Sequence, residues 1–301
     1  MKSFIDCIPC FIDQTLGSVR SITDDTVLHE KILKKVLRVV SDLDMGDSPP
    51  AMGQKIHRII REMTGNADPY QSNKERYNRF AESLMPMLKK KIDGRGDAFE
   101  NGLRMAIAGN IIDFGKNHAL TEDDVLKVIN QCFSVLIDMD AVASLKEEVL
   151  CAKTILYLGD NAGEIVFDRF FIEQLPVEKI TYVVRGRPII NDVTKVDAEE
   201  VNMNQLVRVA DNGSDAPGTI LSDCSPGFVE RFHQADLIIS KGQGNYETLS
   251  GMDNNIYFLL QAKCPVIARD IGCEIGAYIV RKNAISRIIE GNPKQGAANT
   301  K

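Results

Sequence analysis

The chain has 301 residues, of which 44% are hydrophobic and 26% charged, and its formal net charge is −6. This composition is typical of a globular protein that buries one large core or two modest ones. The acidic balance and the lack of a basic stripe argue against nucleic acid as a main partner, and no apolar run is long enough to predict a membrane span. The seven cysteines are scattered and odd in number. We therefore expect reduced thiols and a cytoplasmic location.

The first half of the chain carries the spacing of amphipathic helices. Apolar residues recur near helical spacing in residues 26–42, 52–63, 74–92, 101–114 and 121–136. Pro49 and Pro50 interrupt this pattern. Thr121, with Asp124 three residues later, is typical of a capped helix start. These features predict an N-terminal all-helical domain over residues 1–150.

From about residue 151, short β-branched runs alternate with helical stretches. Strands are predicted at residues 154–158, 180–184, 206–209, 237–240 and 266–268, and helices between them at 165–175, 193–202 and 228–234. This order predicts an α/β domain over residues 151–301, with a parallel, Rossmann-like sheet that carries helices on both faces. Such sheets bind ligands beyond the carboxyl ends of their strands, near a topological switch point.

Four of the five predicted strands end in polar loops that contain glycine. The loops are Gly-Asp-Asn-Ala-Gly-Glu at 159–164, the segment 185–192 that ends in Asn-Asp, Asp-Asn-Gly-Ser-Asp at 211–215, and Lys-Gly-Gln-Gly-Asn at 241–245. In a parallel sheet, all four lie along one edge. The first loop also opens directly into a predicted helix, whose N-terminus favours an anion.

Asp160, Asn161 and Asp192 offer only oxygen ligands. Carboxylate and amide oxygens suit a hard divalent cation such as Mg²⁺ or Mn²⁺. Three protein ligands leave coordination positions for water and for a phosphate oxygen. Helix capping is the alternative interpretation for each residue taken alone, above all for Asp192, which directly precedes a predicted helix.

Lys241 follows the fourth predicted strand. An ammonium group in this position can neutralise a phosphoryl oxygen, and Gly242 and Gly244 let backbone amides approach an anion closely. A solvent-exposed lysine in a turn is the alternative. The loop matches neither the Walker pattern nor a complete G-x-G-x-x-G pattern.

Cys7 and Cys10 form a C-x-x-C pair. A zinc site would need two more ligands nearby, for which Cys264 and Cys273 are the later candidates. A redox pair is a second interpretation. The spacing by itself favours a third, in which two small apolar side chains lie one helical turn apart in the core. The four histidines show no paired spacing, and the absence of G-x-S-x-G gives a serine-triad hydrolase no support.

In combination, these motifs resemble the metal-dependent damage-control phosphatases, a family long catalogued as a domain of unknown function. The likeness covers nearly the whole chain. It is carried by the loops at 160–164, 191–194 and 241–245 and, in the helical half, by Asp68-Pro-Tyr with Lys74 and Asn78 and by the segment 109–113. Cys7 and Cys10, together with Lys263-Cys264, resemble a branch found largely in prokaryotes.

The resemblance implies a three-layer α/β/α domain with the N-terminal helical domain as a cap on the substrate side. It also implies hydrolysis of phosphate esters with Mg²⁺, Mn²⁺, Co²⁺ or Ni²⁺. A structural role or a second metal site is implied for Cys7, Cys10 and Cys264.

We therefore expect a metal-dependent phosphatase that acts on small phosphorylated metabolites such as sugar phosphates. Asp160, Asn161 and Asp192 would hold one cation, which would bind a phosphate oxygen and help to orient a water for in-line attack. The remaining phosphoryl oxygens would be held by Lys241, Gly242, Gly244 and Asn245. Asp211 is expected to orient the water as a base or to contact the substrate. The expected contacts from the helical domain are Asn110 and Asp113.

Two other functions fit the same loops. A methyltransferase that uses S-adenosylmethionine also places an acidic, glycine-containing loop after its first strand, but it would bind its cofactor without metal and would need Lys241 little. A non-catalytic protein that binds phosphorylated metabolites would hold its ligand tightly without turnover. A carboxylate nucleophile is an alternative to water, although none of the four strand-end loops contains the Asp-x-Asp of aspartyl-phosphate phosphatases.

Overall fold

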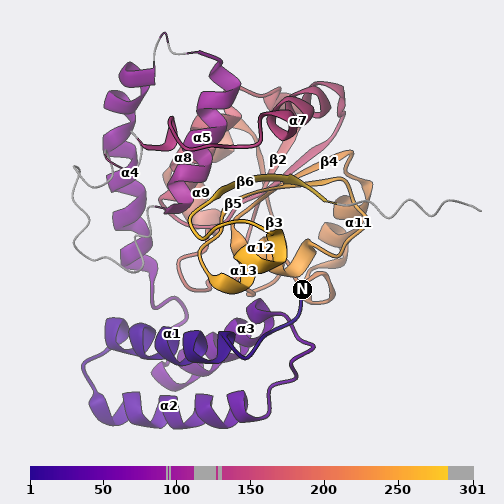
Figure 1. Ribbon diagram of the computed structural model, residues 1–301. Coiled ribbons are helices and arrows are strands. Elements are labelled where there is room, and N and C mark those ends of the chain that lie inside the picture. Colours follow the sequence, from indigo (N-terminus) through magenta and orange to yellow (C-terminus); the bar gives the residue numbers. More distant parts are fainter. Residues whose placement is uncertain (93, 95, 112–126, 128–130, 284–301) are drawn as a thin grey trace, which may run out of the picture.

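A six-stranded sheet with the strand order β3-β2-β1-β4-β5-β6 forms the centre of the computed structural model (Figure 1). The structure describes residues 1–92, 94, 96–111, 127 and 131–283. The strands are β1 (Ile155–Leu158), β2 (Ile180–Val184), β3 (Arg208–Asp211), β4 (Leu237–Lys241), β5 (Ile256–Gln261) and β6 (Tyr278–Lys282). Strands β1 to β5 are parallel, and β6 is antiparallel to β5. The predicted fold class is therefore confirmed.

The strand order places a topological switch point between β1 and β4. The chain first moves outward from β1 to β2 and β3, and then returns to the other side of β1 with β4 and β5. In the register of the sheet, Leu158 at the end of β1 lies opposite Val183 of β2 and Ser240 of β4. The loop that follows β1 therefore lies between the loops that follow β2 and β4, where sheets of this kind bind ligands.

Helices cover both faces of the sheet, because alternate strand residues are apolar on each face. One core joins the sheet to α4 (Gln71–Ile92), α5 (Ala98–Ile111), α7 (Met139–Cys151), α8 (Glu164–Ile172), α9 (Lys195–Glu200) and α10 (Met203–Leu206). The opposite core joins it to α11 (Pro226–Gln234), α12 (Gln243–Leu249) and α13 (Pro265–Ile271). Together these make three layers.

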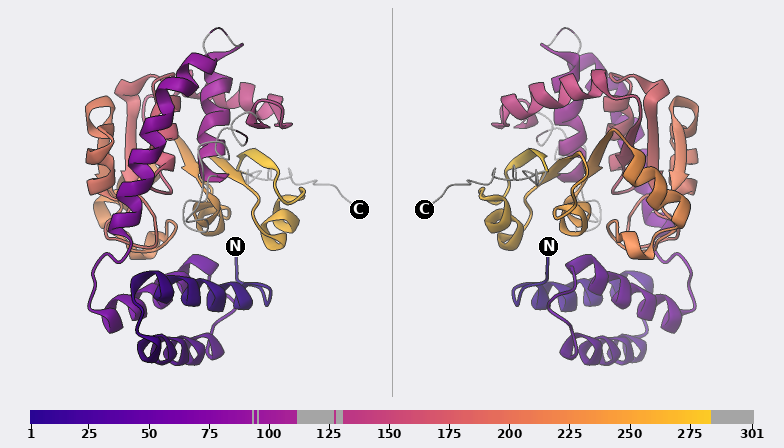
Figure 2. Two further views of the ribbon diagram at one scale, coloured as in Figure 1. Left: turned by 90° about the vertical axis from the view of Figure 1, so that its left-hand side faces the viewer. Right: turned by 90° about the vertical axis from the view of Figure 1, so that its right-hand side faces the viewer.

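The first three helices form a separate layer at one end of the sheet (Figure 2). They are α1 (Cys7–Ile22), α2 (Thr26–Ser41) and α3 (Pro49–Thr64), and they share a core of their own. Helix α3 contacts the loops beyond β2 and β3: Nη1 of Arg61 donates to the carbonyl oxygen of Pro188 at 2.8 Å, and Nε of Arg58 donates to Asp215 at 3.0 Å. This layer therefore faces the carboxyl ends of the strands.

The helical half of the chain thus packs in two ways. Helices α1 to α3 face the strand ends, whereas the core of α4, α5 and α7 continues into the sheet. The division of the chain at residue 150 stays a prediction. None of the helices within the described residues combines the length and the apolarity needed to cross a membrane.

Several predicted elements need correction. The predicted strand at 266–268 is wrong, because these residues lie in α13; Pro265 occupies its first turn, where a missing N–H costs nothing, and Gly272 ends it in the left-handed conformation. Strands β5 and β6 and helices α1, α7, α10 and α12 were not predicted, and β3 begins two residues later than expected. The predicted interruption between two helices is present, since α2 ends at Ser41 and α3 begins at Pro49, but the two prolines lie in the first turn of α3 rather than outside it. The predicted helix at 121–136 lies largely outside the described residues.

Candidate functional site

The loop after β1 is joined by its backbone to the segment after β2. Asn161 and Asp192 form an isolated antiparallel bridge, and the N–H of Val193 donates to the carbonyl oxygen of Asp160 at 2.9 Å. The bridge brings together Asp160, Asn161 and Asp192, the three residues predicted as metal ligands. It forms because both segments leave neighbouring parallel strands at the same edge of the sheet.

The hydrogen bonds of this group leave oxygen atoms available. Nδ2 of Asn161 donates to Oδ2 of Asp160 at 2.8 Å and to Oε2 of Glu164 at 3.2 Å. Oδ2 of Asp192 accepts from Nε of Arg185 at 2.7 Å. Within the described residues, no hydrogen bond reaches Oδ1 of Asn161 or Oδ1 of Asp192. Two oxygens of the predicted set are thus open to a cation.

The site carries more negative charge than its own cations offset. Burial raises the pKa of Asp160 to about 8, and the neighbouring charges of Glu164 and Asp192 act in the same direction, against Arg185 and Lys263. Burial also raises the pKa of Asp192 to about 6, although Arg185 opposes the shift. A divalent cation would relieve the repulsion among these carboxylates.

Arg185 is a site residue that the sequence did not single out. Its side chain is buried, and its guanidinium group is held by Asp192 and, through Nη1, by Oδ1 of Asn245 at 3.2 Å. Nη2 lies 3.8 Å from Oδ1 of Asp160 and has no hydrogen-bond partner among the described residues. A buried N–H group without a partner is costly unless a ligand satisfies it. The only sequence signal was its position directly after β2.

The side chain of Lys241 is buried beneath the loop that follows β1 and does not line a space that is open to a substrate. It is fully buried, and Nζ contacts Oε1 of Glu164 at 2.6 Å, Oδ1 of Asp168 at 2.5 Å and the carbonyl oxygen of Ala106 at 2.9 Å. Burial by itself would lower the pKa of Lys241, but the Asp168 and Glu164 carboxylates raise it above its ordinary value. All three donors of the ammonium group are in use. A contact with a phosphoryl oxygen would require one of these partners to be replaced.

The two glycines of the 241–245 loop permit close packing. At Gly242, where φ is +79°, a Cβ atom would lie 2.0 Å from Oδ2 of Asp160, and at Gly244 it would lie 2.2 Å from the carbonyl oxygen of Pro217. The N–H of Gly242 already donates to Leu259 at 3.1 Å. These positions need glycine because the backbone approaches its neighbours too closely for a side chain.

Asn245 connects the ends of two central strands. Its buried Nδ2 donates to the carbonyl oxygen of Lys241 at 2.8 Å and to that of Gly159 at 3.3 Å. Since its Oδ1 accepts from Arg185, the amide joins the tips of β1 and β4 to the guanidinium group. This bonding assigns Asn245 a positioning role in the structure.

Residues from α4 bind to the segments that follow β1 and β2. Oδ1 of Asn78 accepts from the N–H of Gly163 at 2.7 Å, directly before α8. Nζ of Lys74 contacts Asp197 of α9 at 3.1 Å and Asp68 at 2.9 Å. These helical residues therefore fix the starts of α8 and α9, on either side of the bridge between Asn161 and Asp192.

The other predicted residues lie apart from this group or outside the description. Asp211 ends β3, and its Oδ2 pairs with Nζ of Lys195 at 2.5 Å. Within the described part of the chain it makes no hydrogen bond or ion pair with Asp160 or Asp192. Asn110 lies in α5, but its side chain is outside the description, as is Asp113 altogether.

The cysteines predicted as a structural or metal group are neighbours. Burial raises the pKa of the Cys7 thiol, and the nearby Cys264 and Cys10 contribute to the rise. Nε2 of Gln243 lies 3.7 Å from Sγ of Cys264. Among the residues that the structure describes, no group of three or more His, Cys, Asp or Glu side chains is arranged as a metal site. The role of these thiols stays a prediction.

The fold and the site together define a class: doubly wound α/β proteins with oxygen-bearing side chains and a buried arginine at the switch point. Residues 3–279 match the model of the damage-control phosphatase ARMT1-like domain, and the chain belongs to this family. The predicted family is thereby confirmed, while its branch with an N-terminal C-x-x-C pair stays a prediction.

Relatives with this name resemble the chain over most of its length. A damage-control phosphatase of Archaeoglobus fulgidus is 32% identical over 282 residues, which cover 91% of this chain and 97% of that protein. The damage-control phosphatase PH1575 of Pyrococcus horikoshii is 32% identical over 288 residues, which cover 94% and 99%. A crystal structure of a DUF89 family protein from Pyrococcus horikoshii matches with a TM-score of 0.86 at 30% identity, and the match covers 94% of this chain and 100% of that one.

Proposed function

We propose that this chain is a metal-dependent phosphatase that hydrolyses phosphate esters of small metabolites, including damaged compounds and side products. The names of its relatives support phosphatase activity on such compounds. The observation that carries the proposal is the backbone bridge between Asn161 and Asp192, which gathers three oxygen-bearing side chains beside Nη2 of Arg185, an atom that makes no hydrogen bond within the described residues.

Asp160, Asn161 and Asp192 would hold one divalent cation, for which Mg²⁺, Mn²⁺, Co²⁺ and Ni²⁺ are the candidates. The donor set fits such an ion because it consists of oxygens, two of which accept no hydrogen bond within the described residues. The raised pKa of Asp160 also supports a bound cation, because it reflects burial and surplus negative charge. A bound cation would supply Lewis-acid stabilisation of the phosphoryl group and of an attacking water.

Arg185 would donate a hydrogen bond from Nη2 to a phosphoryl oxygen. Because Asp192 and Asn245 already fix its guanidinium plane, little conformational entropy is lost when the anion binds. Lys263 is exposed, and its charge lowers the pKa of Asp160, so it is placed to meet the substrate from the solvent side. These two cations replace Lys241 as the favoured phosphate contacts, and Lys241 positions α8 through Glu164 and Asp168.

The substrates that we propose are small phosphorylated metabolites such as sugar phosphates. Helices α1 to α3 face the strand ends and would form the wall opposite the cation. A loop this deeply buried excludes much of the solvent, which strengthens the interaction of Arg185 and the cation with a dianion.

The test is phosphate release by the purified full chain from p-nitrophenyl phosphate and a panel of sugar phosphates. Protein stripped with EDTA should be inactive and should recover activity with Mn²⁺, Co²⁺ or Mg²⁺. Asp160→Ala and Asn161→Ala should each lower the metal-dependent rate about 10²- to 10³-fold. Asp253→Ala removes an exposed carboxylate as a matched control and should keep the wild-type rate.

Undiminished activity of Asp160→Ala would overturn the metal assignment. Tight binding of phosphorylated metabolites without turnover would instead favour a non-catalytic binding protein. Metal-independent binding of S-adenosylmethionine, with no phosphate release, would favour the methyltransferase.

A further inference from the structure

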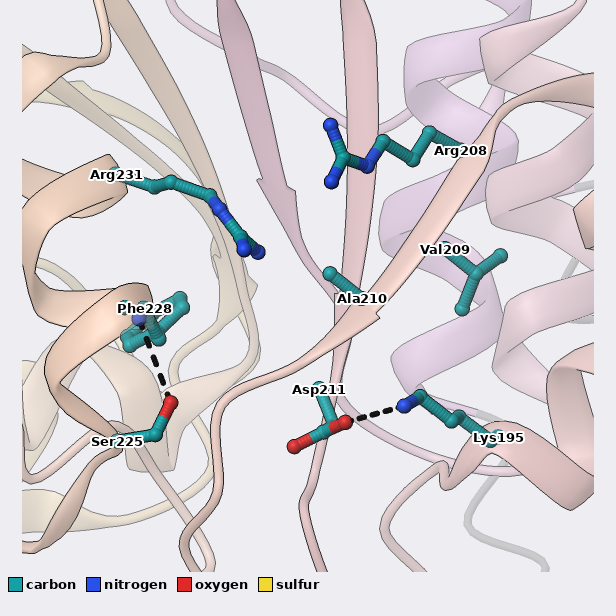
Figure 3. Close-up of a pocket in the computed structure, with 9 residues that line it drawn as sticks. Lys195, Arg208, Val209, Ala210, Asp211, Ser225, Phe228 and Arg231 are labelled. Atoms are coloured by element: carbon teal, nitrogen blue, oxygen red, sulfur yellow. Dashed lines mark hydrogen bonds and ion pairs between the residues drawn. The ribbon is translucent and has the colours of Figure 1, made fainter.

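A cavity of about 300 Å³ lies beside β3, the strand at one edge of the sheet (Figure 3). Its wall consists of β3, the first residue of α9 and the first two turns of α11. Asp160, Asn161 and Asp192 do not line it. The cavity is therefore distinct from the proposed metal site.

Positive charge dominates the wall of this cavity. Lys195, Arg208 and Arg231 line it, against the single carboxylate of Asp211. Lys195 and Asp211 form an ion pair at 2.5 Å. The carboxylate of Asp211 therefore offsets the charge of Lys195, and the charges of the two guanidinium groups are not offset. Figure 3 shows these groups entering the same space from opposite sides.

Neither arginine has a charge partner in the described part of the chain. Among the described residues, the side chains of Arg208 and Arg231 make no hydrogen bond and no ion pair. Like charges that face one another repel, and exposure to water only partly screens the repulsion. An anion between them would remove that cost and would accept hydrogen bonds from both groups.

Rigid elements hold the two arginines. Arg208 and Ala210 lie on one face of β3, and the small Ala210 leaves space in front of the strand. Helix α11 is capped by Ser225, and the buried Phe228 fixes it against the sheet. Arg231 follows Phe228 by three residues and therefore lies on nearly the same face of the helix.

We propose that this cavity binds a small phosphate dianion, either inorganic phosphate or the phosphate group of a metabolite. Arginine matches phosphate through paired N–H donors, and after the ion pair is counted the wall keeps two positive charges, which match a dianion. Its volume is at the lower end of the range for ligand pockets, which favours a small molecule. The inference does not depend on phosphatase activity.

The experiment is a titration of the full chain with inorganic phosphate in EDTA, followed by amide chemical shifts in NMR. EDTA removes metal ions, so phosphate bound through a cation at Asp160 does not contribute. We expect a saturable response centred on β3 and the first turns of α11. The double variant Arg208→Gln with Arg231→Gln should weaken the affinity about tenfold or more.

Arg20→Gln with Arg38→Gln is the matched control. It removes two exposed arginines from α1 and α2 and changes the net charge equally. It should keep the wild-type affinity. An equal loss in both double variants, or the absence of saturation in the wild type, would overturn the proposal.

Asp211→Asn gives a second measurement that does not depend on the arginine variants. It removes the only carboxylate that the described residues contribute to the cavity wall, and it frees Lys195. Phosphate should then bind several-fold more tightly. Weaker or unchanged binding would contradict the proposed charge arrangement.

Discussion

The loops at the β1–β4 switch point and the cavity beside β3 arrange charge in opposite ways. At the switch point, carboxylates outnumber the cations that contact them, and the side chains are mostly buried. Beside β3, cations outnumber the carboxylate and are exposed. Under our two proposals, the first region would need a cation before it accepts an anion, whereas the second would accept an anion directly. This difference predicts separate responses to substitution, to metal and to pH.

The largest expected effect is on stability and follows Lys241→Met. The substitution leaves Glu164 and Asp168 buried without their cation, which should cost about 3–5 kcal/mol in free energy of unfolding. Urea denaturation measures it. Lys89→Met, which breaks an exposed pair with Glu173, is the control and should cost about 0–1 kcal/mol. Wild-type stability combined with a raised KM for phosphate esters would restore Lys241 as a direct phosphate contact.

The next effect is on activity and follows Gly242→Ala. A Cβ atom would lie 2.0 Å from Oδ2 of Asp160, at a backbone angle that side chains rarely adopt. Displacement of this carboxylate should lower the metal-dependent rate about 10²-fold. Gly251→Ala, where a Cβ meets only open space, is the matched control. Full activity of Gly242→Ala would show that the position of Asp160 does not limit catalysis.

The two regions also differ in how far the sequence could predict them. Short β-branched runs that end in polar, glycine-containing loops predicted where β1, β2 and β4 end, and parallel strands bring such ends to one edge. The proximity of Asp160, Asn161 and Asp192 follows from that rule. The segment 266–268 was misassigned because a run of three apolar residues fits either a strand or a helix, and Pro265 favours the helix.

Charge partners could not be predicted, because they depend on the strand order. Glu164 and Asp168 are four residues apart on one face of α8, but only the adjacency of β1 and β4 places Lys241 between them. In the sequence, neither Arg208 nor Arg231 belongs to a motif that would indicate a binding site. Their common cavity appears only when α11 packs beside the edge strand. Local patterns therefore predict elements, and the topology decides which charges meet.

Metal and pH should act together at the switch point. Burial raises the pKa values of Asp160 and Asp192 to about 8 and about 6, above the ordinary value of 3.8. The folded apo protein then holds more protons than the unfolded chain, so its stability should fall as pH rises from about 4 to about 8. Deprotonated carboxylates bind metal, and Mn²⁺ should therefore raise the Tm more at pH 8 than at pH 5.5.

Thermal unfolding in EDTA and in Mn²⁺ at the two pH values measures this difference. Asp160→Asn should reduce it. An equal rise in Tm at both pH values would contradict the proposed role of these carboxylates.

The smallest expected effect is at the cavity, with Lys195→Gln. Its pair with Asp211 is largely exposed, so its loss should change the free energy of unfolding by less than about 1 kcal/mol. The freed Asp211 carboxylate would lower the positive charge of the wall, and phosphate in EDTA should bind about three- to tenfold more weakly. Urea denaturation and the NMR titration measure the two quantities separately. A large loss of stability would mean that the pair supports the fold and that the cavity depends on it. A small loss with weaker binding would mean that the exposed region uses its charges for a ligand, in contrast to the buried pairs at the switch point.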